Sequence, residues 1–294
     1  MRTDIAVRAV LAVALALVAA GCGNAGTADI TTVPAVAAPP ALPGASTGEY
    51  RFDCGDGGEG HRNADNMITS PGRSGAAHHL HEYVGNVSTG AGSTDASLAA
   101  AETTCLNGDR SAYYWPVLRT GEPHRGEVRT PSNVELSFLG NPTGPVIAAP
   151  DTMRMLAGNA KAVTSGGAFA RPSWSCEGFR DRLTNTYPSC PDGAATLRIH
   201  DFPSCWDGRR TDSPDHRAHL AYPSPVNGAC PQGTFAVPRL RVVLSYELDG
   251  DDFVIDTFPE EKNSAVADHA DAVLAIGPEL MAAIVGCLNG ERSC

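Results

Sequence analysis

Eight cysteines in the segment 54–294 constrain this chain more than any other feature of its sequence. The chain has nine cysteines in 294 residues, and the ninth, Cys22, follows an apolar N-terminal segment. An even set of cysteines in an exported chain is typical of a disulfide framework. A cysteine-bound zinc ion is disfavoured because no CxxC pair occurs anywhere in the sequence. We therefore expect four disulfides.

The spacing of the cysteines leaves most of their pairing open. Two short separations favour local loops, and we expect these to be Cys176–Cys190 and Cys205–Cys230. The remaining four cysteines would then form the other two disulfides.

The first residues are typical of an export signal. Arg2 and Arg8 precede an unbroken apolar run over residues 9–20, which is short for a bilayer span. The run ends in VAAGC, which resembles the lipobox of bacterial lipoproteins with alanine in place of the usual leucine. We expect residues 1–21 to be a signal peptide and Cys22 to carry the lipid that anchors the protein to the outer face of the cell membrane. An ordinary cleaved signal is the alternative.

The rest of the chain divides into a tether and one domain. Residues 22–49 are rich in Ala, Pro, Gly and Thr and contain no Lys or Arg, which is typical of an extended linker. Residues 50–294 are long enough for one sizeable core and contain no internal repeat, so we expect a single domain. The formal net charge of −11 disfavours contact with a phosphate backbone, and we expect no nucleic-acid partner.

Short β-branched runs predict a mainly β protein. The segments 133–138, 195–200 and 240–246 alternate or run as half-buried strands do. A run of strong helix formers over 278–288 predicts a C-terminal helix, and a shorter helix is expected near 95–104. We expect a β-sandwich-like domain with long loops stapled by disulfides and with a C-terminal helix; an α+β fold is the alternative.

The stretch AAHHLHEYVGN places three of the nine histidines within four positions. In an extended chain, residues two apart share a face, so His79 and His81 would present both imidazoles to one side while His78 faces the other. Such a pair suits metal binding or acid/base chemistry. A solvated or hydrogen-bonded pair is the alternative.

Two other stretches also combine histidine with aspartate. Asp207 lies beside a cysteine and before a turn glycine, and His216 and His219 downstream share a side only if their segment is helical. His269 and Asp271 share a face if extended, where a carboxylate can fix the imidazole tautomer. The alternatives are a turn at Asp207 and a helix start near His269.

Aromatic residues could line a sugar-binding cleft, because sugar rings stack on exposed aromatic faces. The candidates are Tyr83, Tyr113, Tyr114 and Trp206. Packing of these rings into the core explains the pattern equally well. No HExxH or P-loop motif occurs in the sequence.

Several motifs follow one another in a characteristic order and spacing. They are FDCG (52–55), MITSPG (67–72), HLHEYVGN (79–86), SAYYWP (111–116), CPDG (190–193), FPSCWDG (202–208), HRAH (216–219) and CP (230–231). In this order they resemble the secreted family catalogued as domain of unknown function nineteen-ninety-six. That family occurs in actinobacteria and fungi, where it can accompany WSC modules thought to bind wall polysaccharide.

The resemblance implies that a set of polar residues forms a site, although it carries over no established activity. The residues are His79, His81, Asp207, His216, His219, His269 and Asp271. The chain departs from the family pattern after the last of these, where aromatics and a tryptophan are usual and AVLAI stands instead. A substrate wall made by those aromatics would be altered here.

These observations lead to two functional expectations. The first is a hydrolase acting on envelope polysaccharide or glycolipid, in which the histidines and aspartates of one cleft share acid/base work or hold a divalent metal ion. The second is a wall-glycan-binding or structural module without catalysis. Convergence of the separate His/Asp stretches in space distinguishes the two.

Overall fold

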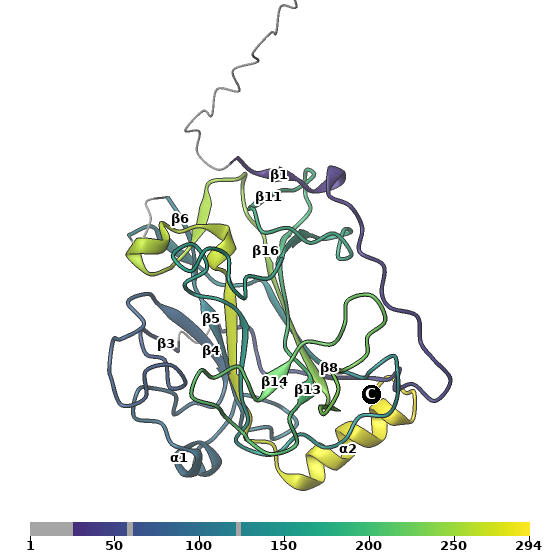
Figure 1. Cartoon of the computed structure of the whole chain (residues 1–294). Coiled ribbons are helices and arrows are strands. Elements are labelled where there is room, and N and C mark those ends of the chain that lie inside the picture. Colours follow the sequence, from purple (N-terminus) through teal and green to yellow (C-terminus); the bar gives the residue numbers. More distant parts are fainter. Residues whose placement is uncertain (1–25, 58–60, 122–124) are drawn as a thin grey trace, which may run out of the picture.

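The computed structural model describes residues 26–57, 61–121 and 125–294, and two five-stranded antiparallel sheets form its centre (Figure 1). The first sheet runs, in order, β10 (Trp174–Cys176), β12 (Thr196–Asp201), β16 (Arg239–Tyr246), β8 (Asn133–Leu139) and β2 (Glu49–Phe52). The second runs β3 (Arg62–Asn63), β4 (His81–Gly85), β5 (Ala112–Pro116), β18 (His269–Val273) and β9 (Arg154–Gly158). The expected strands over 133–138, 195–200 and 240–246 are confirmed as β8, β12 and β16.

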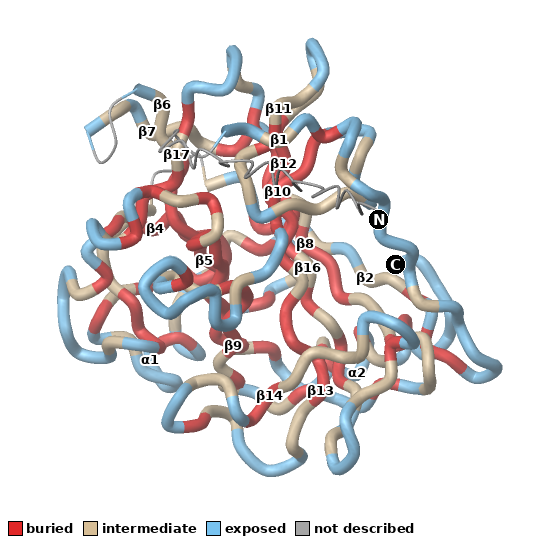
Figure 2. Tube along the Cα trace, turned by 45° about the horizontal axis from the view of Figure 1, so that its top comes forward, coloured by how far each residue is buried: buried red, intermediate tan, exposed pale blue. Residues whose placement is uncertain are grey.

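The main core lies between these two sheets. Phe138 of β8 and Val242 of β16 belong to the same buried cluster as Trp115 of β5 and Ala270 of β18. Because side chains alternate along a strand, Tyr114 points to the opposite face of β5 and joins a second buried cluster. The second sheet is therefore covered on both faces, as the buried β4, β5 and β9 show in Figure 2.

Smaller elements close the sandwich. Two three-stranded sheets are formed by β14 (Leu220–Ala221), β13 (Cys205–Trp206) and β15 (Phe235–Ala236), and by β17 (Phe253–Ile255), β6 (Leu118–Thr120) and β7 (Glu127–Arg129). The helices are α1 (Asp95–Ala100) and α2 (Pro278–Asn289), with 3-10 turns η1 (Ile30–Thr32), η2 (Pro259–Glu261) and η3 (Ala265–Ala267). The fold is the mainly β, sandwich-like arrangement with a C-terminal helix that the sequence predicts. Among the described residues, no helix has the length and apolar character needed to cross a membrane.

All eight cysteines of the domain are paired. The disulfides are Cys54–Cys105, Cys176–Cys190, Cys205–Cys230 and Cys287–Cys294. The two local loops expected from the sequence are thus confirmed. The predicted signal peptide and Cys22 lie outside the described residues.

The segment predicted to be a tether is packed against the domain over its described part. Ala28–Asp29 forms β1, which pairs in parallel with β11 (Pro188–Ser189), and Ile30 is fully buried. Further along, the Val36 amide donates to the Asp181 carbonyl, and the chain continues down the side of the molecule (Figure 1). The expectation of a free linker up to residue 49 is corrected here, because tertiary contacts order a segment whose composition carries no strand or helix signal.

Candidate metal centre

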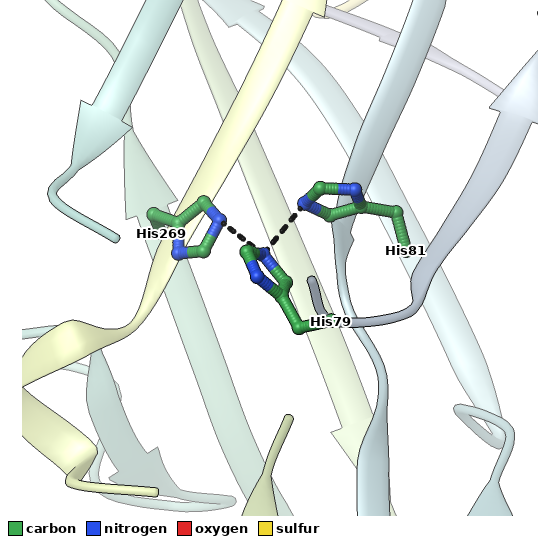
Figure 3. A group of neighbouring side chains, drawn as sticks. All are labelled: His79, His81 and His269. Atoms are coloured by element: carbon green, nitrogen blue, oxygen red, sulfur yellow. Dashed lines mark hydrogen bonds between the residues drawn. The ribbon is translucent and has the colours of Figure 1, made fainter. Parts of the chain in front are cut away.

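Two neighbours of β5 bring the histidines of distant segments together. His81 opens β4 and lies opposite Pro116 of β5, while Asp271 of β18 lies opposite Tyr114. Since β18 is antiparallel to β5, His269 reaches the level of Pro116 and therefore of His81. His79 precedes β4 by two residues and turns its ring into the space between the other two (Figure 3).

The ring nitrogens of the three histidines converge. The distance from His79 Nε2 is 3.0 Å to His81 Nε2 and 3.4 Å to His269 Nε2, and one nitrogen of each ring lies within 4.8 Å of the others. Four-coordinate zinc with Zn–N bonds of about 2.0–2.1 Å requires nitrogens about 3.3 Å apart. The rings are nearly perpendicular in pairs, with interplanar angles of 70°, 87° and 90°. The two separations from His79 bracket the nitrogen spacing that zinc requires, which favours a single metal ion held by the three imidazoles.

Backbone carbonyls fix the tautomers of two of these rings. His81 Nδ1 lies 3.0 Å from the Asp65 carbonyl oxygen, and His269 Nδ1 lies 2.9 Å from that of Ala267. A carbonyl only accepts, so each Nδ1 carries the hydrogen and each Nε2 presents a lone pair to the centre. Outer hydrogen bonds of this kind accompany metal-bound histidine in proteins.

Burial keeps the imidazoles of His81 and His269 neutral. The exposed fractions of His79, His81 and His269 are 4%, 0% and 4%. Burial, together with the nearby histidines, holds the pKa of His81 well below its usual value, and burial lowers the pKa of His269 to about 3. A neutral imidazole is the form that binds a metal ion.

Aromatic rings enclose the three histidines. The ring of Phe258 meets His79 edge-on at 5.0 Å between centroids, and Tyr114 meets His81 in the same way at 5.3 Å. Phe258 is partly exposed, whereas Tyr114 is fully buried. Phe258 therefore stands between His79 and the surface.

A group of hydrogen-bonded polar side chains, Asp271, Asn66 and Tyr114, lies next to the histidines on the same sheet face. Asp271 follows His269 by two residues and accepts a hydrogen bond of 2.7 Å from Asn66 Nδ2. The Tyr114 hydroxyl donates to Asn66 Oδ1 at 3.2 Å. Burial raises the pKa of Asp271 to about 7, against the opposing influences of Asn66, Arg217 and Tyr114. Asp271 thus shares the sheet face with the histidines, as expected.

The other three polar residues expected at this site are engaged in local contacts elsewhere. Asp207 accepts the amides of Arg209 and Arg210 at 2.9 and 3.0 Å and pairs with the Arg210 side chain, which is the turn weighed as its alternative. His216 pairs with Asp212 at 2.9 Å. His219 contacts Ser213 Oγ and the Arg154 carbonyl. Asp207 and His216 are thus engaged within turns and His219 binds β9, while the ligand atoms that converge belong to His79, His81 and His269.

The aromatic side chains expected to stack on sugars pack into the protein. Tyr113 and Tyr114 have no exposed surface, and Tyr83 is 2% exposed with its hydroxyl bonded to Asn63 and the Asp65 carbonyl. Trp206 is partly buried against the core, and its indole N–H donates to the Arg210 carbonyl. The structure therefore places the three tyrosines as core residues, because a ring without an exposed face offers no surface to a sugar.

Sequence reasoning missed three residues that surround the centre. Asn66 binds Asp271, Phe258 covers His79, and Arg217 donates to the carbonyl of Gly158, the residue opposite His269. Arg217 lies inside the HRAH motif, between the two histidines that were predicted to belong to the site. No sequence signal marks the other two, because their roles depend on which loops meet over the sheet.

Comparison with known proteins identifies the family of this chain. The family model described as Domain of unknown function (DUF1996) matches residues 66–277, a segment that contains all three histidines. A search of curated proteins and a search of solved structures found no match. Since the matched segment makes up most of the chain, the protein belongs to the family Domain of unknown function (DUF1996).

Proposed function

We propose that this protein is a metal-dependent hydrolase of the cell envelope in which His79, His81 and His269 hold one divalent transition-metal ion. The observation that carries the proposal is the convergence of three ring nitrogens, two of which belong to neutral imidazoles in the metal-binding tautomer. Imidazole ligands without thiolate suit Zn²⁺, Cu²⁺ and Ni²⁺. Zn²⁺ is the natural choice for hydrolysis because it has no redox chemistry.

Three protein ligands support catalysis more than a structural role. Structural zinc sites have four protein ligands, whereas catalytic sites have three and leave one position for water or substrate. A bound ion would lower the pKa of a water molecule and so supply a nucleophile near neutral pH. The carbonyls of Asp65 and Ala267 would hold the ligand rings in place, and Asp271 lies on the same sheet face to take part in proton transfer.

The proposed location and substrate rest on other features. The N-terminal leader pattern and the four disulfides are typical of an exported protein, and a lipid on Cys22 would hold it at the outer face of the membrane. Envelope polysaccharide or glycolipid is the substrate class within reach of such a protein. The net charge of −11 argues against nucleic acid.

The burial of the three histidines favours a second candidate, a wall-glycan-binding or structural module in which the ion only stabilises the fold. The exposed fractions of the three rings are 4% or less, and Phe258 packs against His79. While Phe258 stays in place, only small molecules can reach the rings. The two candidates differ in the fourth coordination position. In the Co²⁺-loaded protein, azide should change the visible spectrum if that position is open and leave it unchanged if the site is closed.

Metal analysis tests the proposal. The mature protein, freed of metal and incubated with one equivalent of Zn²⁺, should retain about one ion per chain after gel filtration. His81→Gln and His269→Gln should lose the ion, whereas His78→Asn, a change at the exposed neighbouring histidine, should retain it. Failure of the mature protein to retain Zn²⁺, Cu²⁺ or Ni²⁺, or retention in both ligand variants, would contradict a three-histidine metal centre.

A further inference from the structure

Three cationic side chains on segments that adjoin β9 each lie over an aromatic ring. Lys161 Nζ is 4.9 Å from the centroid of Phe258, and the guanidinium carbon of Arg217 is 4.8 Å from that of Phe169. The third pair has the shortest distance, 3.6 Å. It is formed by Arg171 and Tyr222. We call these six residues the cationic rim.

The rim adjoins the centre from two sides. Phe258 contacts Lys161 on one side and His79 on the other. Arg217 donates a hydrogen bond of 2.9 Å to the carbonyl of Gly158, which is paired with His269 in the sheet. A ligand that occupies the rim therefore lies next to the three histidines.

The rim cations have no carboxylate in ion-pair contact. Among the ion pairs of the described residues, Arg62, Arg119, Arg180, Arg198 and Arg241 each have an acidic partner within 3.0 Å. Within the same described ranges, Lys161, Arg171 and Arg217 have none. In a chain with a net charge of −11, cations without an ion-pair partner attract an anion, although Arg217 is also attracted by Asp271 and Asp215.

The loop that carries Lys161, Phe169 and Arg171 is held in position by hydrogen bonds. The buried carboxylate of Glu261 accepts the amides of Val163 and Thr164, at 2.7 and 3.2 Å. Asn159 Nδ2 donates to the carbonyl of Ala168 at 2.7 Å. These bonds fix the backbone on both sides of the loop.

Phe169 combines an unfavourable backbone conformation with an exposed side chain. Its φ of 57° lies in the left-handed region, which is unfavourable for a bulky residue, and 62% of it is exposed. Strained residues of this kind persist where the surrounding structure enforces them, and they gather at binding sites. An exposed aromatic ring beside a guanidinium offers an apolar face and a charge together.

We propose that the cationic rim binds an acidic glycan, with Lys161, Arg171 and Arg217 pairing with anionic groups on the sugars and the exposed Phe169 ring packing against a sugar face. This inference rests on the proposed function and names the substrate class of the same site. The anionic group is a carboxylate or a phosphate ester, since guanidinium binds both in the same bidentate manner.

Affinity measurements with defined polymers test the rim. The probes are polygalacturonate, which carries carboxylates, dextran phosphate, which carries phosphate esters, and neutral dextran. The mature protein should bind one or both acidic polymers and not neutral dextran, with an affinity that falls as salt is added. The acidic polymer that binds more tightly identifies the anionic group.

Charge-removing variants locate the binding surface. Lys161→Gln and Arg171→Gln should each weaken binding about tenfold, the effect of losing one charge-assisted hydrogen bond. Arg209→Gln removes the same charge from an exposed position near Asp207 and should bind like the parent protein. Equal binding by the parent and both rim variants, or binding of dextran as tight as that of the acidic polymers, would overturn the proposal.

Zinc retention, measured on the same samples, separates this inference from the proposed function. Lys161→Gln and Arg171→Gln should retain Zn²⁺, because the three histidines that would hold the ion are unchanged. A protein that binds acidic glycan through the rim but retains no metal would uphold the rim and refute the hydrolase. A protein that retains Zn²⁺ but binds no acidic polymer would refute the rim alone.

Discussion

At the scale of single residues, a buried ion pair lies directly behind the metal centre. Arg198 and Asp268 are fully buried and joined by a hydrogen bond of 2.5 Å, and Asp268 immediately precedes His269. The same guanidinium donates to the carbonyl of Pro116, the strand position between His81 and His269. The pair therefore connects the first sheet to the strands that carry the ligands.

Removal of Arg198 should destabilise the protein strongly. Arg198→Met leaves the Asp268 carboxylate buried without its cation, and such changes cost about 3–5 kcal/mol of the free energy of unfolding. Arg180→Met removes an exposed arginine and should cost less than about 1 kcal/mol. Urea unfolding of both variants measures the difference, and similar costs would contradict a buried, uncompensated charge.

Individual residues also show how much of the site can be predicted from the sequence. The two-residue periodicity of an extended chain indicates that His269 and Asp271 share a face, and the structure agrees. Asp207 looks equally suitable in sequence, but its carboxylate caps a local turn. The same residue types close turns and meet across a sheet, so only the tertiary structure distinguishes the two roles.

At the scale of elements, long strands and short strands differ in their predictability. The strands β8 and β16 are seven and eight residues long and contain alternating or consecutive apolar residues that favour an extended, half-buried conformation. The two-residue strand β1 has no such pattern and exists because its backbone meets β11. Elements that form only through tertiary contacts lie in segments that the sequence predicts to be tether or loop.

The disulfides link these elements with unequal effect on stability. Cys54–Cys105 spans 51 residues and joins the end of β2 to the segment after α1, whereas Cys287–Cys294 spans 7 residues at the end of α2. Because the entropy removed from the unfolded chain grows with loop length, Cys54→Ala/Cys105→Ala should cost about 4 kcal/mol and Cys287→Ala/Cys294→Ala about 2.5 kcal/mol. Thermal unfolding of the two double variants gives this order, and the reverse order would show that native packing at α2 outweighs loop entropy.

At the scale of the whole molecule, the two sheets differ in what they bury. The second sheet is covered on both faces and holds the histidines, while the outer face of the first sheet carries exposed ion pairs such as Arg180 with Glu135. Neutral imidazoles are thus buried in the interior of a molecule whose charged groups lie mainly outside. This arrangement makes the stability of the entire fold sensitive to acid.

Acidification should destabilise the protein through His200, which lies on β12. Burial lowers the pKa of His200 to about 4, against the opposing attraction of Asp268, while an unfolded histidine has a pKa of about 6.5. Below pH 6.5 the unfolded chain binds a proton that the folded protein does not, until the pH reaches about 4. The free energy of unfolding therefore falls over this interval, by about 3 kcal/mol for this group.

The measurement compares the parent protein with His200→Gln, whose side chain does not titrate. Urea unfolding at several pH values between 7 and 4 should give a steeper loss of stability for the parent, with a difference in slope approaching about 1.4 kcal/mol per pH unit. Both proteins still lose stability as other groups titrate, so only the difference between their slopes is assigned to His200. Parallel curves would show that His200 is protonated in the fold, paired with Asp268, whose carboxylate lies 3.6 Å from its Nε2.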